Sequence, residues 1–187
     1  MSGIELKPTP LRAHLPNVLT TLRLLLLPVF WIVMIGGDGV SRTACALFAI
    51  ASATDWFDGY LARRFQHSTR FGRLADPLAD RLLINSAVIL LWYHDRLTWL
   101  APVLIIGRDI VLALSIGSAA RHGYELSVIY LGKTATALLM IGLALMLATR
   151  AQWPVLLFWS GLALLLVAGG VYLLTVRARR EQHARDF

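Results

Sequence analysis

Six long apolar segments, separated by short polar connections, dominate this sequence and leave little chain for anything else. Each is close to the roughly 20 apolar residues that a helix needs to cross a bilayer. With breaks taken at glycine, proline and charge clusters, the pattern predicts helices over residues 17–37, 42–64, 71–94, 97–122, 128–149 and 153–176. We therefore expect one all-α integral membrane domain, residues 1–187, with six transmembrane helices in one bundle. Residues 1–16 are expected to form a short interfacial segment.

The composition agrees with a bilayer as solvent. Apolar residues make up 57% of the 187 residues, charged residues only 16%, and the mean hydropathy is +0.65, which excludes an intrinsically disordered chain. A single cysteine, Cys45, excludes a disulfide scaffold. The net charge of +7 lies at the ends of apolar runs, so it favours contact with anionic lipid and not with nucleic acid.

The distribution of basic residues predicts the orientation of the chain. Among the Lys and Arg residues in the connections, in the tails and near the ends of the expected spans, with the deeper Arg23, Arg81 and Arg108 left out, twelve lie on one face and three on the other. The three are Arg42, Arg96 and Arg150. Because positive charge accumulates on the cytoplasmic side, both termini are predicted to be cytoplasmic. The first apolar run has no convincing cleavage site, so we expect a retained helix in the cytoplasmic (inner) membrane of a prokaryote.

Four acidic residues gather in the second and third expected helices. Asp55 and Asp58 are three residues apart, and Asp76 and Asp80 are four apart, so each pair shares one face of its helix. The loop between the two helices is short and basic, which favours antiparallel neighbours and carboxylates at one depth. The alternative is a pair of solvated helix ends or a salt-bridge network with nearby arginines.

Carboxylates clustered in a membrane need a positive partner, because each costs about 2.5–3.5 kcal/mol at the bilayer centre and they repel one another. Oxygen ligands without histidine or cysteine suit Mg²⁺ or Mn²⁺, and we expect two ions. Two ions could clamp a diphosphate and stabilise the leaving group of a displacement at phosphorus. The small residues Gly59, Ala62 and Gly72 leave space for such a ligand, although small residues also serve helix packing.

The whole pattern from residue 55 to residue 80, D-x2-D-G-x2-A-R-x8-G-x3-D-x3-D, resembles the signature of the CDP-alcohol phosphatidyltransferase family. The resemblance implies a six-helix membrane enzyme, usually a homodimer. Such an enzyme transfers a phosphatidyl group from CDP-diacylglycerol to an alcohol and releases CMP.

The resemblance also implies roles for individual residues. Asp55, Asp58 and Asp76 would be the principal metal ligands. Asp80 would be a further ligand or the general base that takes the proton of the acceptor hydroxyl. Gly59, Ala62 and Arg63 would line the CDP-diacylglycerol site, where we also place Gly72.

Three further cations indicate an anionic acceptor. Arg108 lies in the middle of an apolar helix, where a charge is costly unless paired, and Asp109 is adjacent rather than on the same helical face. An acceptor phosphate would satisfy it, and Arg121 and Lys133 flank the next connection and could complete the pocket. The alternative is snorkelling to lipid headgroups.

The segment D-P-L-A-D and the residues around Arg108 resemble the branches of the family that make phosphatidylglycerophosphate and cardiolipin. The first expected acceptor is sn-glycerol 3-phosphate. Phosphatidylglycerol is the second, because Arg108-Asp109 stands where bacterial glycerophosphate enzymes commonly have Arg-Glu. Inositol phosphate is the third. Rivals of other classes are a small cation transporter, disfavoured because the acidic pattern has no second copy, and a catalytically silent lipid-binding homologue.

Overall fold

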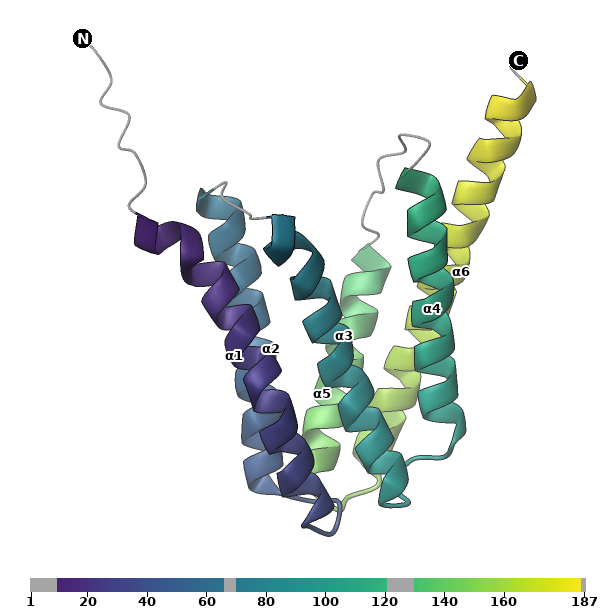
Figure 1. Ribbon diagram of the computed structural model, residues 1–187. Helices are drawn as coiled ribbons and strands as arrows, with labels where there is room; N and C mark the ends of the chain where they lie inside the picture. Colours follow the sequence, from purple (N-terminus) through teal and green to yellow (C-terminus); the bar gives the residue numbers. More distant parts are fainter. Residues whose placement is uncertain (1–9, 66–69, 121–129, 186–187) are drawn as a thin grey trace. The chain divides into compact units, whose positions relative to one another are not determined.

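The computed structural model describes residues 10–65, 70–120 and 130–185, with side chains described at 21–54, 78–114, 132–171, 173 and 174. These residues form helices only, as the sequence predicts (Figure 1). The helices are α1 (Pro10–Ile35), α2 (Arg42–Phe65), α3 (Arg70–Tyr93), α4 (Leu100–Ala120), α5 (Tyr130–Ala148) and α6 (Trp153–Arg185). The chain divides into an N-terminal unit, residues 1–90, and a C-terminal unit, residues 91–187.

The expected helix boundaries are confirmed within a few residues for α2, α3, α4 and α5, and they are wrong at two ends. Helix α1 begins at Pro10, so the described end of the expected interfacial segment is continuous with the first helix. Helix α6 continues to Arg185, nine residues beyond the apolar run, because the Arg- and Ala-rich tail contains good helix formers. Hydropathy marks where apolar residues stop and not where a helix stops.

In the N-terminal unit, α1 and α2 form an antiparallel pair joined by a short turn (Figure 1). The turn contains Gly39 with a φ of 81°, a left-handed conformation that suits glycine. Ser41 caps α2, because its Oγ accepts a hydrogen bond from the backbone N–H of Ala44 at 3.2 Å. The rings of Phe30 and Phe48 then meet between the helices, with centroids 6.3 Å apart.

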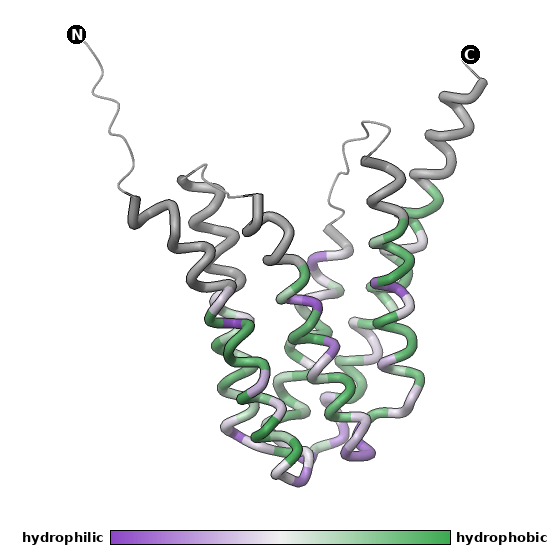
Figure 2. The backbone as a smooth tube through the Cα atoms, viewed as in Figure 1, coloured by the Kyte–Doolittle hydropathy of each residue, from purple (hydrophilic) through white to green (hydrophobic). Residues whose placement is uncertain are grey.

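Large apolar side chains lie on the outside of the described helices as well as inside. Ile32, Leu114 and Leu156 are each more than 70% exposed, and hydrophilic residues concentrate near the turns (Figure 2). Within the described residues, Trp153–Val171 is long and apolar enough to cross a membrane, while Thr21–Ile35, Arg42–Thr54 and Gly132–Ala148 are shorter apolar helices. Exposed apolar surface of this kind suits contact with lipid.

In the C-terminal unit, Arg96 fastens the turn after α3 to the end of α5. Its guanidinium donates hydrogen bonds to the carbonyls of Met146, at 2.6 Å, and Thr149, at 2.9 Å. Carbonyls at the end of a helix have no partner within the helix, and an arginine supplies both donors and favourable charge there. The turn itself places Asp95 at a φ of 58°.

Helices α5 and α6 approach each other closely at two glycines. A Cβ on Gly161 would lie 2.6 Å from the backbone nitrogen of Leu139, and a Cβ on Gly142 would lie 2.7 Å from that of Phe158. Small residues allow such backbone contact between helices where lipid provides no hydrophobic driving force. The pair α5–α6 is therefore the tightest packing in the described part of the C-terminal unit.

We expect Gly161→Ala to destabilise the protein by roughly 1–3 kcal/mol, because one methyl group forces two helix backbones apart. Gly170→Ala is the matched control on the same helix, since nothing lies within 4 Å of a Cβ at that position. Unfolding of both variants in detergent, followed by circular dichroism, measures the difference. Equal stability of the two variants would contradict the close approach.

Candidate functional site

The buried side of α2 leads directly to the first pair of acidic residues. Ala44, Phe48 and Ala51 are at most 1% exposed, and their spacing of four and three residues follows one face of the helix. The next two steps of the same spacing reach positions 55 and 58. The backbone of α2 therefore places Asp55 and Asp58 in line with its buried face. Their side chains lie outside the described residues.

The buried side of α3 leads to the second pair in the same way. Ala79 and Leu83 are at most 1% exposed and Ser86 is 8% exposed. Continued toward the start of the helix, the stripe reaches Asp76 and then Gly72. The helical spacing thus places positions 55, 58 and 76 in line with the buried faces of α2 and α3, which a solvated pair of helix ends would not require.

Asp80 is the one acidic residue of the motif whose side chain the structure describes. It lies in α3 beside Ala79, which is fully buried, and its own side chain is half-buried, with the Oδ1 atom inaccessible to solvent. Position 80 is one turn after Asp76 on the helix. A carboxylate oxygen held at the interior of an apolar unit suits a cation or a transferable proton.

The donor set of the N-terminal unit fits Mg²⁺ or Mn²⁺. All four candidate ligands are carboxylates, which these hard cations prefer. Cys45, the single cysteine of the chain, lies ten residues before Asp55 on α2, a distance of about 15 Å along a helix. A soft sulfur ligand is therefore remote from the acidic positions.

The residues predicted to line the CDP-diacylglycerol site lie on the same helices. Positions 59, 62 and 63 belong to the last turns of α2, and position 72 belongs to the first turn of α3. The side chains of Ala62 and Arg63 are outside the described set, so their roles remain predictions.

The structure corrects the expectation that Arg108 has no charged partner on its own helix. Adjacent residues do not share a helix face, and we therefore expected Asp109 to leave Arg108 without a partner. In the structure, Nη1 of Arg108 forms an ion pair with Oδ1 of Asp109 at 2.9 Å. The long arginine side chain bends along the helix surface and reaches its neighbour, so an acceptor phosphate is not needed to neutralise it.

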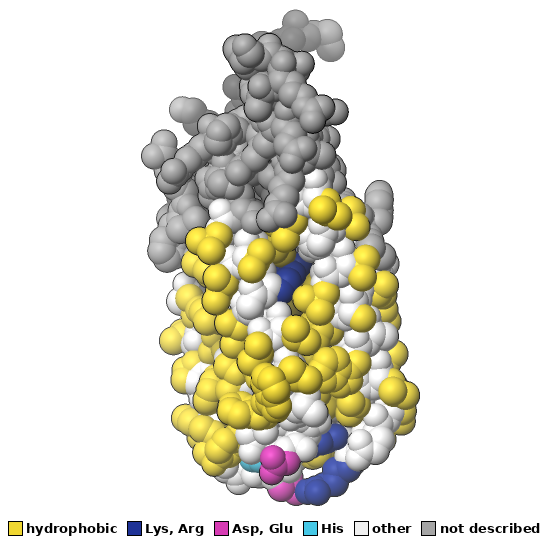
Figure 3. Space-filling model, turned by 90° about the vertical axis from the view of Figure 1, so that its right-hand side faces the viewer, with side chains coloured by type: hydrophobic (Ala, Val, Ile, Leu, Met, Phe, Trp, Pro, Cys, Tyr) yellow, Lys and Arg dark blue, Asp and Glu magenta, His cyan; other side chains and the backbone are white. Residues whose placement is uncertain are grey.

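Arg108 nevertheless faces open space. It lines a groove of about 310 Å³ between α4 and α6, with apolar walls that include Val111, Leu112 and Leu166. Its Nε atom is buried and has no hydrogen-bond partner among the described residues. Figure 3 shows a basic side chain recessed within a hydrophobic surface on the side that carries these helices. A guanidinium with an unused donor in such a groove can bind an anion.

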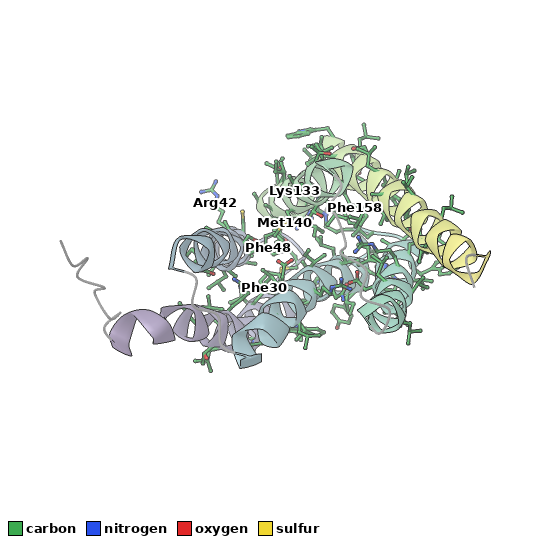
Figure 4. All side chains as sticks on the ribbon, turned by 90° about the horizontal axis from the view of Figure 1, so that it is seen from above. Phe30, Arg42, Phe48, Lys133, Met140 and Phe158 are labelled. Atoms are coloured by element: carbon green, nitrogen blue, oxygen red, sulfur yellow. The ribbon has the colours of Figure 1, made fainter. Side chains whose placement is uncertain are left out.

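The other two cations of the predicted acceptor pocket are only partly placed. Lys133 lies in the first turn of α5, and its side chain is exposed (Figure 4). Arg121 lies outside the described residues. The convergence of Arg108, Arg121 and Lys133 on one phosphate stays a prediction.

The structure also contains a buried arginine for which the sequence analysis predicted no role. Arg23 of α1 is 1% exposed and is the largest fully buried side chain of the described residues. The sequence offered a signal, because Arg23 is the only charged residue between positions 18 and 35. Sequence alone does not distinguish a buried arginine from one that snorkels to the membrane surface.

Comparisons with known proteins give the same family as the one that the acidic pattern resembles. The family model described as CDP-alcohol phosphatidyltransferase matches residues 13–168. A Pseudomonas fluorescens protein named CDP-diacylglycerol–glycerol-3-phosphate 3-phosphatidyltransferase is 38% identical over 177 residues, covering 86% of this chain and 85% of its own length. An Escherichia coli (strain K12) protein of the same name is 37% identical over 160 residues, covering 83% of this chain and 86% of its own.

Proposed function

Because this chain belongs to the CDP-alcohol phosphatidyltransferase family, we propose that it transfers the phosphatidyl group of CDP-diacylglycerol to sn-glycerol 3-phosphate. The products are CMP and phosphatidylglycerophosphate, so the enzyme acts in phospholipid biosynthesis. The observation that carries the proposal is the helical spacing of the motif, in which positions 55 and 58 continue the buried stripe of α2, position 76 continues that of α3, and Asp80 is half-buried one turn later. The names of the relatives support the choice of acceptor.

Asp55, Asp58, Asp76 and Asp80 would hold two Mg²⁺ or Mn²⁺ ions. When bound, these ions neutralise the diphosphate of CDP-diacylglycerol and stabilise the charge of the departing CMP. Gly59, Ala62 and Gly72 would leave room for the nucleotide beside the carboxylates, and Arg63 would supply a positive charge to its phosphates.

The reaction needs one proton acceptor and no covalent enzyme intermediate. Asp80 takes the proton from the primary hydroxyl of glycerol 3-phosphate as the oxygen attacks the phosphorus that carries the diacylglycerol. A bond forms between that oxygen and phosphorus, while the bond from the same phosphorus to the bridging oxygen of the diphosphate breaks. The electron pair leaves with CMP. The half-buried position of Asp80 in α3, with its Oδ1 atom inaccessible to solvent, supports this role.

Arg108, Arg121 and Lys133 would bind the phosphate of the acceptor. For Arg108, the support is its position in the groove between α4 and α6 and its buried Nε atom. The ion pair with Asp109 would hold the guanidinium in place when no acceptor is present.

The enzyme would work in the cytoplasmic (inner) membrane as a six-span protein with cytoplasmic termini. The family resemblance implies that it forms a homodimer. Exposed apolar side chains on α1, α4 and α6 and the basic residues near the predicted cytoplasmic helix ends support this setting. Membrane lipids would then surround the helices, and CDP-diacylglycerol would enter from the bilayer.

Release of CMP by the purified protein tests the proposal. With CDP-diacylglycerol and Mg²⁺ in detergent, we expect glycerol 3-phosphate to stimulate CMP release at least about tenfold over phosphatidylglycerol or inositol phosphate. Such a ratio corresponds to about 1.4 kcal/mol of preference in the transition state. Mass spectrometry of the lipid product identifies phosphatidylglycerophosphate directly.

The other outcomes assign the enzyme differently. Selective stimulation by phosphatidylglycerol would make it a cardiolipin synthase, and selective stimulation by inositol phosphate would make it a phosphatidylinositol phosphate synthase. Cation flux in proteoliposomes without CMP release would favour a transporter that uses the acidic cluster.

A further inference from the structure

Arg23 is a buried charged residue of α1. Its side chain is 1% exposed, and the Nε and Nη2 atoms are inaccessible to solvent. A guanidinium keeps its charge in a protein interior, and burying it is costly unless an opposite charge lies close by. Because α1 contains no acidic residue, the compensating charge must come from another helix.

The register between α1 and α2 indicates which residue supplies the charge opposite Arg23. The helices run antiparallel, so residues that face each other have position numbers with a constant sum. Phe30 faces Phe48, with ring centroids 6.3 Å apart, and the two labelled side chains lie between the helices in Figure 4. Met34 and Ala44, both 0% exposed, have the same sum of 78. In this register Arg23 lies opposite Asp55.

The spacing of Arg23 from Phe30, and of position 55 from Phe48, also determines which face of each helix these positions occupy. A step of seven residues falls only about 20° short of two full helical turns, so Arg23 presents the same face of α1 as Phe30. Position 55 likewise presents the same face of α2 as Phe48. Moving two turns along both helices from the aromatic contact, about 10.5 Å, therefore brings Arg23 and Asp55 to the same level of the interface.

We propose that Arg23 is a positioning residue that holds the carboxylate of Asp55 from the side of α1. Arginine would bind one carboxylate oxygen and leave the other directed at the metal site, as residues behind metal ligands commonly do. It would also reduce repulsion within the carboxylate cluster when no metal is bound. The proposal rests on the proposed function only for the metal role of Asp55, since the pairing itself does not depend on turnover.

The pairing can be tested without metal or substrate. In EDTA-treated protein in detergent, we expect Arg23→Gln to lower the melting temperature by roughly 5–10 °C. In an Asp55→Asn background the same change should have less than about half that effect, because the partner charge is gone. Arg42→Gln is the matched control, since Arg42 is exposed at the start of α2 and points away from α1 (Figure 4). Additive effects of Arg23→Gln and Asp55→Asn would overturn the pairing.

The positioning role is tested by Mn²⁺ binding, measured by electron paramagnetic resonance in the absence of substrate. Removal of a residue behind a ligand costs about 10- to 100-fold in metal affinity, and we expect a loss in this range for Arg23→Gln. Arg23→Lys, which keeps the charge and is the safer variant for folding, should recover part of it. Unchanged or tighter Mn²⁺ binding in both variants would overturn the role. The proposed function fails separately, if wild-type protein releases no CMP while the Arg23–Asp55 coupling is present.

Discussion

Asp80→Asn is expected to reduce CMP release by at least about a thousandfold while the affinity for CDP-diacylglycerol changes only a few-fold. The asparagine side chain has nearly the same shape as the native carboxylate, so it leaves the packing beside Ala79 and Leu83 intact. It cannot accept the proton of the acceptor hydroxyl, and general-base catalysis typically contributes about 10² to 10⁴-fold to a rate. Single-turnover CMP release and equilibrium binding of the nucleotide lipid measure the two quantities separately.

Asp95→Asn is the matched control for this variant. Asp95 is exposed in the turn after α3 and has a left-handed backbone, which asparagine tolerates. It should keep native activity. If Asp80→Asn lost binding and turnover to the same extent, Asp80 would serve as a metal ligand only, and its role as the base would be wrong.

The helices could be predicted from the sequence because apolar runs and charge clusters mark their limits in a membrane. The same information fails at α6, since its charged tail is a good helix former without being apolar. Helix α6 therefore extends to Arg185, whereas hydropathy ends the span at residue 176. The tight contact at Gly161 also requires the structure, because a glycine in an apolar helix does not reveal which helix approaches it.

The acidic residues of the candidate site could be predicted because their order across two helices is specific, whereas the cations could not be assigned fully. For Arg108, helix periodicity excludes a facing neighbour, yet a flexible side chain reaches Asp109 at 2.9 Å. For Arg23, the sequence shows a charge in an apolar run but not its depth. Its burial and the register set by Phe30 and Phe48 become visible only when two helices are packed together.

Asp58→Ala is expected to raise the Mg²⁺ concentration for half-maximal activity by about a hundredfold. Changes to residues behind a ligand already cost 10- to 100-fold, so loss of a direct carboxylate ligand should cost no less. The reason lies in the fold, because position 58 continues the buried stripe of Ala44, Phe48 and Ala51 on α2. Excess Mg²⁺ should restore activity only partly.

A titration of CMP release against Mg²⁺ after treatment with a chelator checks this expectation. Asp38→Ala is the control, since Asp38 is exposed in the turn before α2, and the start of α2 at Arg42 lies about 24 Å along the helix from position 58 at 1.5 Å per residue. Its Mg²⁺ dependence should match that of the native protein. Full activity of Asp58→Ala at limiting Mg²⁺ would remove this residue from the metal site. It would then leave Asp55, Asp76 and Asp80 as the ligands.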